Sequence, residues 1–213
     1  MITLRRMSQR AFSAVELIGV MAILAILTIL LLPQITRRTG KPDVFQTVND
    51  AHVIEAVVAI QSIQAAATAH LAQFGSLASL NGTPLSFSGA YDKFGQVLLT
   101  EGIIERPFAL RLGTNAFLRL VNVSGLSAGS PVNGSSGAYD LNGDGKNAVV
   151  GASFVLEAVI PAVSEAEARA MNDRLDGPSL GASPGTSDVL GRVIYRSAGS
   201  TGLTELHIYV VRK

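Results

Sequence analysis

The chain carries its longest apolar run near the start, from Phe12 to Leu32, and this run holds one charged residue, Glu16. At about 1.5 Å per residue, a helix over this run spans roughly 31 Å, the thickness of a bilayer hydrocarbon core. A carboxylate inside such a span costs roughly a few kcal/mol unless it reaches the headgroups or is paired. The pattern therefore predicts a membrane helix and gives Glu16 a function that requires a partner.

The flanks of this run decide between a cleaved secretory signal and a retained helix. The run is longer than the roughly 7 to 15 apolar residues of a signal, and it ends at Pro33 without an Ala-x-Ala cleavage site. These features favour a retained membrane helix over 12–41. Basic residues lie on both sides of the run: Arg5, Arg6 and Arg10 precede it, and Arg37, Arg38 and Lys41 follow it. The three that follow the run are expected to contact lipid headgroups.

Beyond Pro42 the polar and apolar positions predict one soluble domain over 42–213. Apolar residues in steps of three and four predict a helix over Asp43–Phe74, ended by Gly75. A short helix is expected over Tyr91–Thr100. A capping-box pattern at Ser164 and Glu167 predicts a further helix that ends near Leu175, before Gly177 and Pro178.

Clusters of β-branched and aromatic residues between glycine-rich turns predict the strands. These are expected at Ala116–Val123, Ser153–Ile160, Arg192–Ser197 and Leu203–Val211. Two stretches rich in Gly, Ser and Pro, Ser124–Gly137 and Gly177–Gly191, are expected to be exposed loops. Because the predicted long helix comes first in the chain and most of the predicted strands follow it, we expect an α+β fold, in which a long helical spine packs on a mostly antiparallel sheet.

The residues around the start of the apolar run also resemble a known processing signal. The segment Gln9-Arg10-Ala11-Phe12-Ser13-Ala14-Val15-Glu16-Leu17 is similar to the cleavage site of type IV prepilins and type II secretion pseudopilins. In that family a basic leader, here 1–11, is removed and the new N-terminal phenylalanine is methylated. Cleavage between Ala11 and Phe12 makes Glu16 the fifth mature residue and places Pro33 at mature position 22, which also matches the family. Ala11 departs from the family, whose residue at this place is usually glycine.

The resemblance implies a fold, a partner and a location. It implies a pilin-like head on the helical spine, held in the bacterial inner membrane by a single span and exported to the periplasm or cell surface. It also implies that Glu16 of one subunit meets the N-terminal amine of Phe12 in its neighbour, whereas the alternative is a glutamate that only reaches the headgroups. The implied partners are other pilin-like subunits, a prepilin peptidase, an assembly ATPase, a platform membrane protein and membrane lipid.

Charge and composition limit the remaining functions. Of the 17 basic residues, three lie in the leader, so the rest of the chain has 14 basic and 16 acidic residues and gives no reason to expect nucleic acid. The sequence has no cysteine, which excludes disulfides and thiolate metal sites. The histidines, His52, His70 and His207, are far apart and are expected to be surface or structural residues.

One polar segment matches half of a calcium-binding loop. Asp140, Asn142 and Asp144 place oxygen side chains at positions 1, 3 and 5 of an EF-hand-type pattern, Gly145 provides the turn, and Lys146 offers a backbone carbonyl. The second half fails, because Gly151 stands where a bidentate glutamate belongs, so a site needs a distant carboxylate such as Asp173 or Asp176. The alternative is a plain hydrophilic turn. If calcium binds, we expect a structural role.

A weaker motif suggests catalysis but lacks its context. Gly125-Leu126-Ser127-Ala128-Gly129 has the spacing of a serine nucleophile elbow, and Asp140 and His207 follow in the right order. That motif requires a strand before the serine and a helix directly after it, whereas this segment continues into a loop. We therefore expect no enzyme. The sequence favours a structural subunit that polymerises through its N-terminal helix into a type IV pilus or secretion pseudopilus; the alternative is a minor pilin or competence pseudopilin whose head binds DNA or a surface ligand.

Overall fold

The computed structural model describes residues 44–126 and 137–213 of the chain, with side chains described from residue 49. Apart from 44–46, these residues belong to the unit Thr47–Lys213. The leader and the membrane segment 12–41 lie outside the described residues, as do Ala11, Phe12, Glu16 and Pro33.

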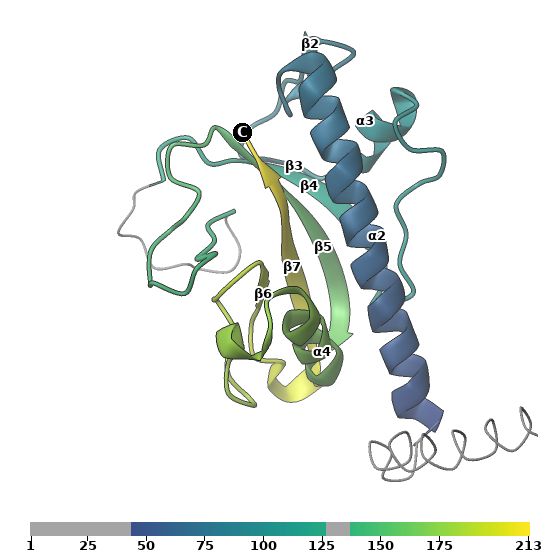
Figure 1. Ribbon diagram of the computed structural model, residues 1–213, viewed down its shortest axis with the longest axis vertical. Helices are drawn as coiled ribbons and strands as arrows, with labels where there is room; N and C mark the ends of the chain where they lie inside the picture. Colours follow the sequence, from purple (N-terminus) through teal and green to yellow (C-terminus); the bar gives the residue numbers. More distant parts are fainter. Residues whose placement is uncertain (1–43, 127–136) are drawn as a thin grey trace, which may run out of the picture. The chain divides into compact units, whose positions relative to one another are not determined.

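The described chain begins with a long helix, α2, at Val44–Phe74 (Figure 1). This confirms the predicted second helical stretch, and Gly75 ends it in the left-handed conformation (φ 71°) with its N–H bonded to the Leu71 carbonyl at 2.9 Å. By length and composition alone, Asn49–Phe74 is long and apolar enough to cross a membrane. One side of it nevertheless enters the core of the domain, through residues three and four apart: Val53, Ala56, Ile60, Ile63, Ala67 and His70.

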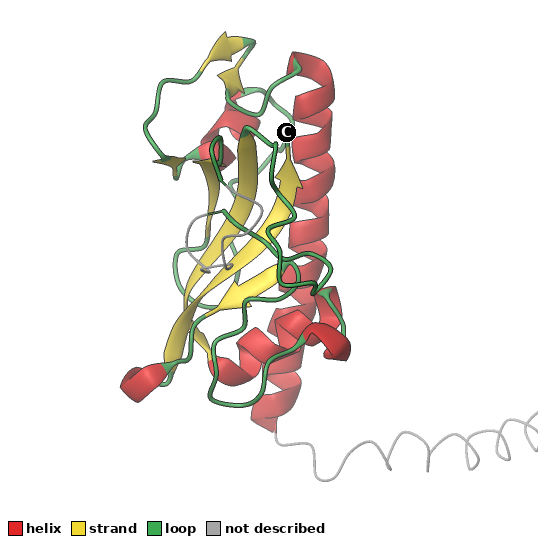
Figure 2. Cartoon of the chain, turned by 90° about the vertical axis from the view of Figure 1, so that its left-hand side faces the viewer, coloured by secondary structure: helices red, strands yellow, loops and turns green. Residues whose placement is uncertain are grey.

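A five-stranded sheet lies against α2, in the order β3-β4-β5-β7-β6, and each neighbouring pair is antiparallel (Figures 1 and 2). Its strands are β3 (Ala90–Tyr91), β4 (Phe117–Asn122), β5 (Phe154–Ser164), β6 (Val193–Tyr195) and β7 (Leu203–Arg212). A separate hairpin pairs β1 (Ser79–Leu80) with β2 (Thr83–Pro84). The four longer predicted strands are confirmed, and the α+β architecture with them.

Short helices complete the domain. α3 spans Phe94–Thr100, so the predicted start at Tyr91 was too early: Tyr91 pairs in β3 instead. α4 spans Glu165–Leu175 and has the predicted capping box, in which the Ser164 hydroxyl accepts the Glu167 N–H and the Glu167 carboxylate accepts the Ser164 N–H. Two single-turn 3-10 helices follow at Pro178–Leu180 and Gly199–Thr201.

The two faces of the sheet bury different side chains. Alternate residues of the strands, among them Leu156, Ala158 and Ile160 of β5, join the buried residues of α2, α3 and α4 in the main core. The opposite face, called the outer face below, carries a smaller apolar cluster of Val121, Val123, Tyr139, Val149, Val155 and Ile194. The described part of the segment after β4, residues 138–152, supplies several members of that cluster.

The central strand β5 is longer than the sequence predicts. It continues past Ile160 to Ser164 through an irregularity in its pairing with β7, where Ala162 has a positive φ of 57°. Pro161 has no N–H to donate to a neighbouring strand, and a bulge is a place in a sheet where this is tolerated. The Pro161 carbonyl accepts the Thr114 N–H at 2.8 Å. The apolar run was correctly read as a strand, but the bulge residues have no period-2 signature.

Candidate functional site

The predicted calcium segment is a tight loop closed by its own backbone. The Asp140 carboxylate is buried and accepts the N–H groups of Asp144 (3.1 Å) and Gly145 (2.8 Å). The Asp144 carboxylate in turn accepts the Lys146 N–H at 2.9 Å. These bonds explain the loop as a turn of Asx residues and glycines. A carboxylate has about four acceptor positions, so Asp140 keeps capacity for a cation.

Of the two carboxylates proposed to complete such a site, Asp173 is exposed on α4 and Asp176 is engaged elsewhere. Asp176 accepts the N–H groups of Arg192 (2.8 Å) and Val193 (2.9 Å), which ties the end of α4 to the start of β6. Within the described ranges there is no group of three or more His, Cys, Asp or Glu residues that could hold a metal ion. Calcium binding at Asp140, Asn142, Asp144 and the Lys146 carbonyl therefore stays a prediction.

The segment 177–191, predicted to be an exposed loop, has a buried anchor. Asp188 is fully buried and accepts the N–H groups of Ala182 and Leu190, both at 3.0 Å. Burial raises the pKa of Asp188 and, at the other end of the segment, the pKa of Asp176. The Gly191 N–H donates to the Asp140 carbonyl at 2.7 Å, so this segment lies beside the candidate calcium loop. The segment is otherwise exposed or half-buried, so the expectation of an exposed loop fails at Asp188 and Gly191, where the Asp188 carboxylate satisfies backbone N–H groups of the loop.

The outer face of the sheet contains a buried charged cluster that sequence reasoning missed. At its centre lies Glu157 of β5, whose carboxylate accepts the Tyr139 hydroxyl at 2.7 Å. His207 Nδ1 lies 3.4 Å from Glu157, His207 Nε2 lies 3.0 Å from Glu205, and Arg119 lies 3.7 Å from Glu157. Burial, followed by the negative charge of Glu157, raises the pKa of Tyr139 well above its usual value, so its hydroxyl stays a donor.

A signal for this cluster was present in the sequence. Glu157 is the single charge in the apolar strand Phe154–Val163, as Glu16 is in the N-terminal run. A lone charge in an apolar element implies a buried partner in both cases. The partners of Glu157 come from three separate segments, and no spacing rule brings Arg119, Tyr139 and His207 together.

His70 and Glu101 form a second buried pair, at the C-terminal part of α2. His70 Nδ1 bonds the Glu101 carboxylate, and the other Glu101 oxygen accepts the Asn81 N–H at 2.8 Å. The rings of Phe74 and Phe94 lie 5.1 and 5.4 Å from the imidazole. The pair joins α2, the β1–β2 turn and the end of α3, which agrees with the structural role expected for this histidine.

The side of α2 that faces away from the sheet is exposed and has little charge. Ile54 and Val58 are 47% and 60% exposed, and they lie one turn apart. The exposed positions that continue this side are small or uncharged: Ala51, Gln61, Ser62, Ala65, Thr68, Ala69 and Ala72. Near its beginning, Asp50 and Glu55 are also exposed. Exposed apolar side chains such as Ile54 and Val58, on the side opposite the core, are typical of a helix that has a second packing partner.

The described residues do not bring the proposed partners of the serine motif, Asp140 and His207, into a catalytic arrangement. Ser127 lies outside the described residues. His207, which would be its base, faces Glu157 and Glu205 on the outer face, whereas the Asp140 carboxylate bonds the backbone of its own loop. The described geometry therefore does not join Asp140 to His207.

Comparisons with protein-family models, curated proteins and solved structures found no match. The proposal for function therefore rests on the residues and on the fold.

Proposed function

We propose that this chain is a structural, pilin-like subunit that polymerises through its N-terminal helix into a type IV pilus or a type II secretion pseudopilus. The observation that carries the proposal is that three sequence features, the cleavage site, Glu16 and Pro33, have the spacing of that family. A cut before Phe12 makes Glu16 the fifth residue of the mature chain and places Pro33 at position 22. A basic leader precedes the cut and an apolar run follows it.

The architecture of the described domain supports this proposal. A filament subunit of this kind needs a helical spine that is held by a folded head and still has a side free for neighbours. α2 follows the apolar run in the chain, buries one side in the α+β core and leaves the side with Ile54 and Val58 exposed. The described head also has no long exposed strand at either sheet edge, since β3 and β6 have two and three residues.

The proposed assembly mechanism is a charge pair between copies. Cleavage creates an α-amino group on Phe12, and the carboxylate of Glu16 from a neighbouring subunit would pair with it in the apolar environment. A buried charge without its counter-charge costs roughly 3–5 kcal/mol, so subunits out of register are disfavoured. The subunit would be extracted from the inner membrane with the help of an assembly ATPase and a platform protein, after processing by a prepilin peptidase.

Replacing Glu16 tests this mechanism. Glu16→Ala removes a charge from the membrane span, so insertion is expected to be unchanged or improved, while filament yield is expected to fall at least tenfold because the amine of Phe12 loses its partner. The measurement is the amount of chain in sheared filaments relative to the membrane fraction. Glu105→Ala, which removes an exposed carboxylate outside α2, is the matched control. Normal filament yield from Glu16→Ala would rule the pairing out.

A further inference from the structure

An open groove lies along one side of α2. One wall of the groove is α2 itself, and the other is the segment 103–109, which follows α3 and runs beside the helix (Figure 1). The volume of the groove is about 620 Å³. An apolar cavity of about 150 Å³ already accommodates benzene, so the groove has room for more than one large apolar side chain. Its α2 wall, from Ala59 to Ala69, is about 15 Å long.

Both walls of the groove are mainly apolar. The side chains on α2 are small apart from one isoleucine: Ala59, Ser62, Ile63, Ala65, Ala66 and Ala69. The other wall consists of Ile103, Ile104, Pro107, Phe108 and Ala109, with Glu105 and Arg106 between them. An apolar groove of this kind is the shape that receives the apolar side of a second helix.

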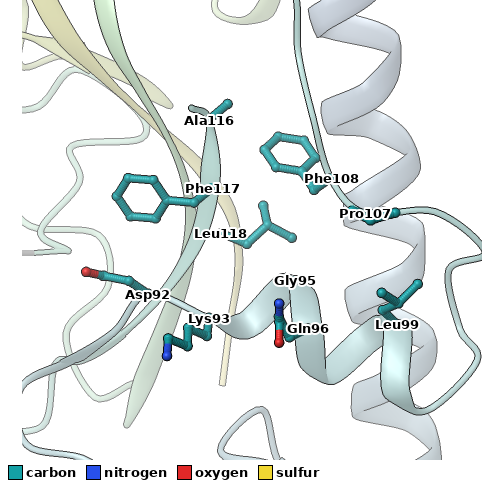
Figure 3. Close-up of a pocket in the computed structure, with 10 residues that line it drawn as sticks. All are labelled: Asp92, Lys93, Gly95, Gln96, Leu99, Pro107, Phe108, Ala116, Phe117 and Leu118. Atoms are coloured by element: carbon teal, nitrogen blue, oxygen red, sulfur yellow. The ribbon is translucent and has the colours of Figure 1, made fainter. Parts of the chain in front are cut away.

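The segment 103–109 is fixed in place, so the groove is formed before a partner arrives. The Ile103 N–H donates to the Leu98 carbonyl of α3 at 2.9 Å. Figure 3 shows the Phe108 ring on the side of the segment toward β4, close to Leu118, and the two residues line a small second cavity of about 230 Å³. A preformed wall costs less conformational entropy on binding than a loop that must first become ordered.

The same helix carries an exposed apolar ridge, made of Ile54 and Val58. These are two of the four large apolar side chains that are exposed in the described chain, and their spacing of four residues places them on one side of the helix. The groove is centred about eight residues further along α2, or about 12 Å. Because both lie on one straight helix, the ridge cannot enter the groove of its own chain, whereas the ridge of a second copy can.

The charges beside the ridge and the groove are complementary. Within one chain, Arg111 beyond the end of the segment already lies 3.8 Å from Glu55 of α2. Asp50, one turn before Ile54, and Arg106 on the groove are both exposed, and neither has an ion pair or hydrogen bond in the described part of the chain. Since α2 has no lysine or arginine, Glu105 has no counter-charge on the ridge and takes no part in the contact.

We infer that the groove receives the Ile54–Val58 ridge of a second copy of this chain, with Asp50 of that copy paired to Arg106. The ridge and the groove are different surfaces, so the contact is heterologous: each copy offers one groove and one ridge, and the series continues without closing. Neighbouring copies would be displaced by about 12 Å along α2. This inference rests on the proposed function, which supplies many copies in one orientation, and it names the contact between their folded domains.

The size of the contact suits a polymer. A stable interface between two free proteins buries about 1,200 Å² or more, which a ridge of two side chains does not reach alone. The contact is therefore expected to form where the N-terminal helices already hold the copies close together, because linked sites bind at a high effective concentration. Purified chains in separate detergent micelles should stay apart.

Disulfide crosslinking tests the contact, because the chain has no cysteine of its own. Ile54→Cys is combined in turn with Ser62→Cys, Ala65→Cys and Ala69→Cys, and sheared filaments are oxidised. Within one chain these pairs are at least about 12 Å apart, beyond the roughly 7 Å that a disulfide can span between Cα atoms. We expect at least one pair to give a ladder of dimers, trimers and longer products. Ile54→Cys alone, and Ile54→Cys with Val150→Cys, should give none.

Further substitutions show whether the crosslink depends on the groove. In the chain that carries Ile54→Cys and Ala69→Cys, Ala65→Phe should lower the crosslinked fraction about tenfold or more, because the ridge loses its place of burial. Ala65→Ser, at the same exposed position, should not. Asp50→Arg and Arg106→Asp should each lower the crosslinked fraction severalfold, and the two together should restore it. Thermal melting checks that each variant is folded.

The outcomes separate this contact from the filament itself. Filaments at the wild-type yield without a ladder from any pair would overturn the contact and leave the proposed function standing. Dimers alone from Ile54→Cys would also overturn it, because they indicate a symmetric contact between two ridges. If the unsubstituted chain forms no filaments, the proposed function fails; the membrane fraction is then oxidised, and absence of a ladder there overturns the contact as well.

Discussion

The two faces of the sheet are held by different kinds of interaction. On the face toward α2, the strands contribute apolar side chains such as Leu120, Leu156 and Ile208, which are fully buried against three helices. On the outer face, Glu157 lies in the middle of the central strand and is balanced by Tyr139, His207 and Arg119. The first face depends on apolar area and close packing. The second depends on complete pairing of a few polar groups.

The difference determines how each face responds to substitution. An apolar core loses stability in proportion to the removed volume, and the remaining cavity adds to the cost. A buried polar cluster loses stability when one member is left without its partner, even if the change of volume is small. Removal of one oxygen atom should therefore be costly on the outer face, whereas on the α2 face the cost should follow the volume that is removed.

The largest effect is expected on the α2 face. Leu156→Ala should lower the free energy of unfolding by about 2–5 kcal/mol, because Leu156 is fully buried in the main core. Denaturant unfolding of the purified chain measures this. Val150→Ala is the control: Val150 is 43% exposed, and its replacement should cost less than about 0.5 kcal/mol. A loss below about 1 kcal/mol for Leu156→Ala would mean that α2 does not cover the sheet as described.

On the outer face, we expect removal of a single oxygen atom to cause a smaller loss of unfolding free energy. Tyr139→Phe should cost about 1–3 kcal/mol, because the buried Glu157 carboxylate loses its hydroxyl donor. In a Glu157→Gln background the same change should cost clearly less, because the charge that needs the donor is gone. Tyr91→Phe provides a matched control, since the Tyr91 hydroxyl has no hydrogen bond within the described chain. Equal losses from Tyr139→Phe in both backgrounds would contradict the pairing.

The contrast between the faces also explains how far the sequence predicted the structure. Period-3.6 and period-2 patterns located α2 and the four longer strands, because those elements bury regular apolar positions. The capping box at Ser164 was readable because it is local. The two-residue strands β1, β2 and β3 carry no pattern of their own, and the bulge at Ala162 depends on pairing with β7.

The candidate sites follow the same division. The loop at Asp140 was visible in the sequence because its bonds are local, from one residue to the fourth and fifth after it. The Glu157 cluster was not visible, because it is assembled from segments that only the fold brings together. Ala11, Phe12, Glu16 and Pro33 remain predictions from the sequence alone.

A pH experiment extends the comparison to the end of α4. Burial raises the folded-state pKa of Asp176, so its contribution to stability is fully present below its usual pKa near 3.8 and is lost as pH rises through the raised value. Asp176→Asn should therefore remove part of the decline in stability over this window while keeping an acceptor for the Arg192 and Val193 N–H groups. The measurement is the free energy of unfolding against pH. Glu165→Gln is an opposite control, because hydrogen bonds from Gly185 and Arg169 lower the pKa of Glu165 and its contribution is lost as pH falls.

The smallest expected effect concerns calcium at the loop beside the outer face. If Asp140, Asn142 and Asp144 bind the ion, the melting temperature should rise by a few degrees with calcium relative to chelator, since a ligand of the folded state stabilises it. Asp144→Ala should abolish this difference, and magnesium should not replace calcium because it requires a stricter octahedral shell. Gly145→Ala is unsuitable as a control because Gly145 has a φ of 78°. Identical melting with calcium and chelator would leave the loop as a plain turn.

The central claim is that the chain is processed and assembled as a pilin-like subunit, and the N-terminus of the chain in membranes tests it most directly. N-terminal sequencing and intact-mass measurement of the chain from a host with a prepilin peptidase should show loss of 1–11 and a methylated Phe12 at the start. The same chain from a peptidase-deficient host should keep its leader. A mature chain that starts at Met1 in both hosts, or that begins after Pro33, would contradict the account.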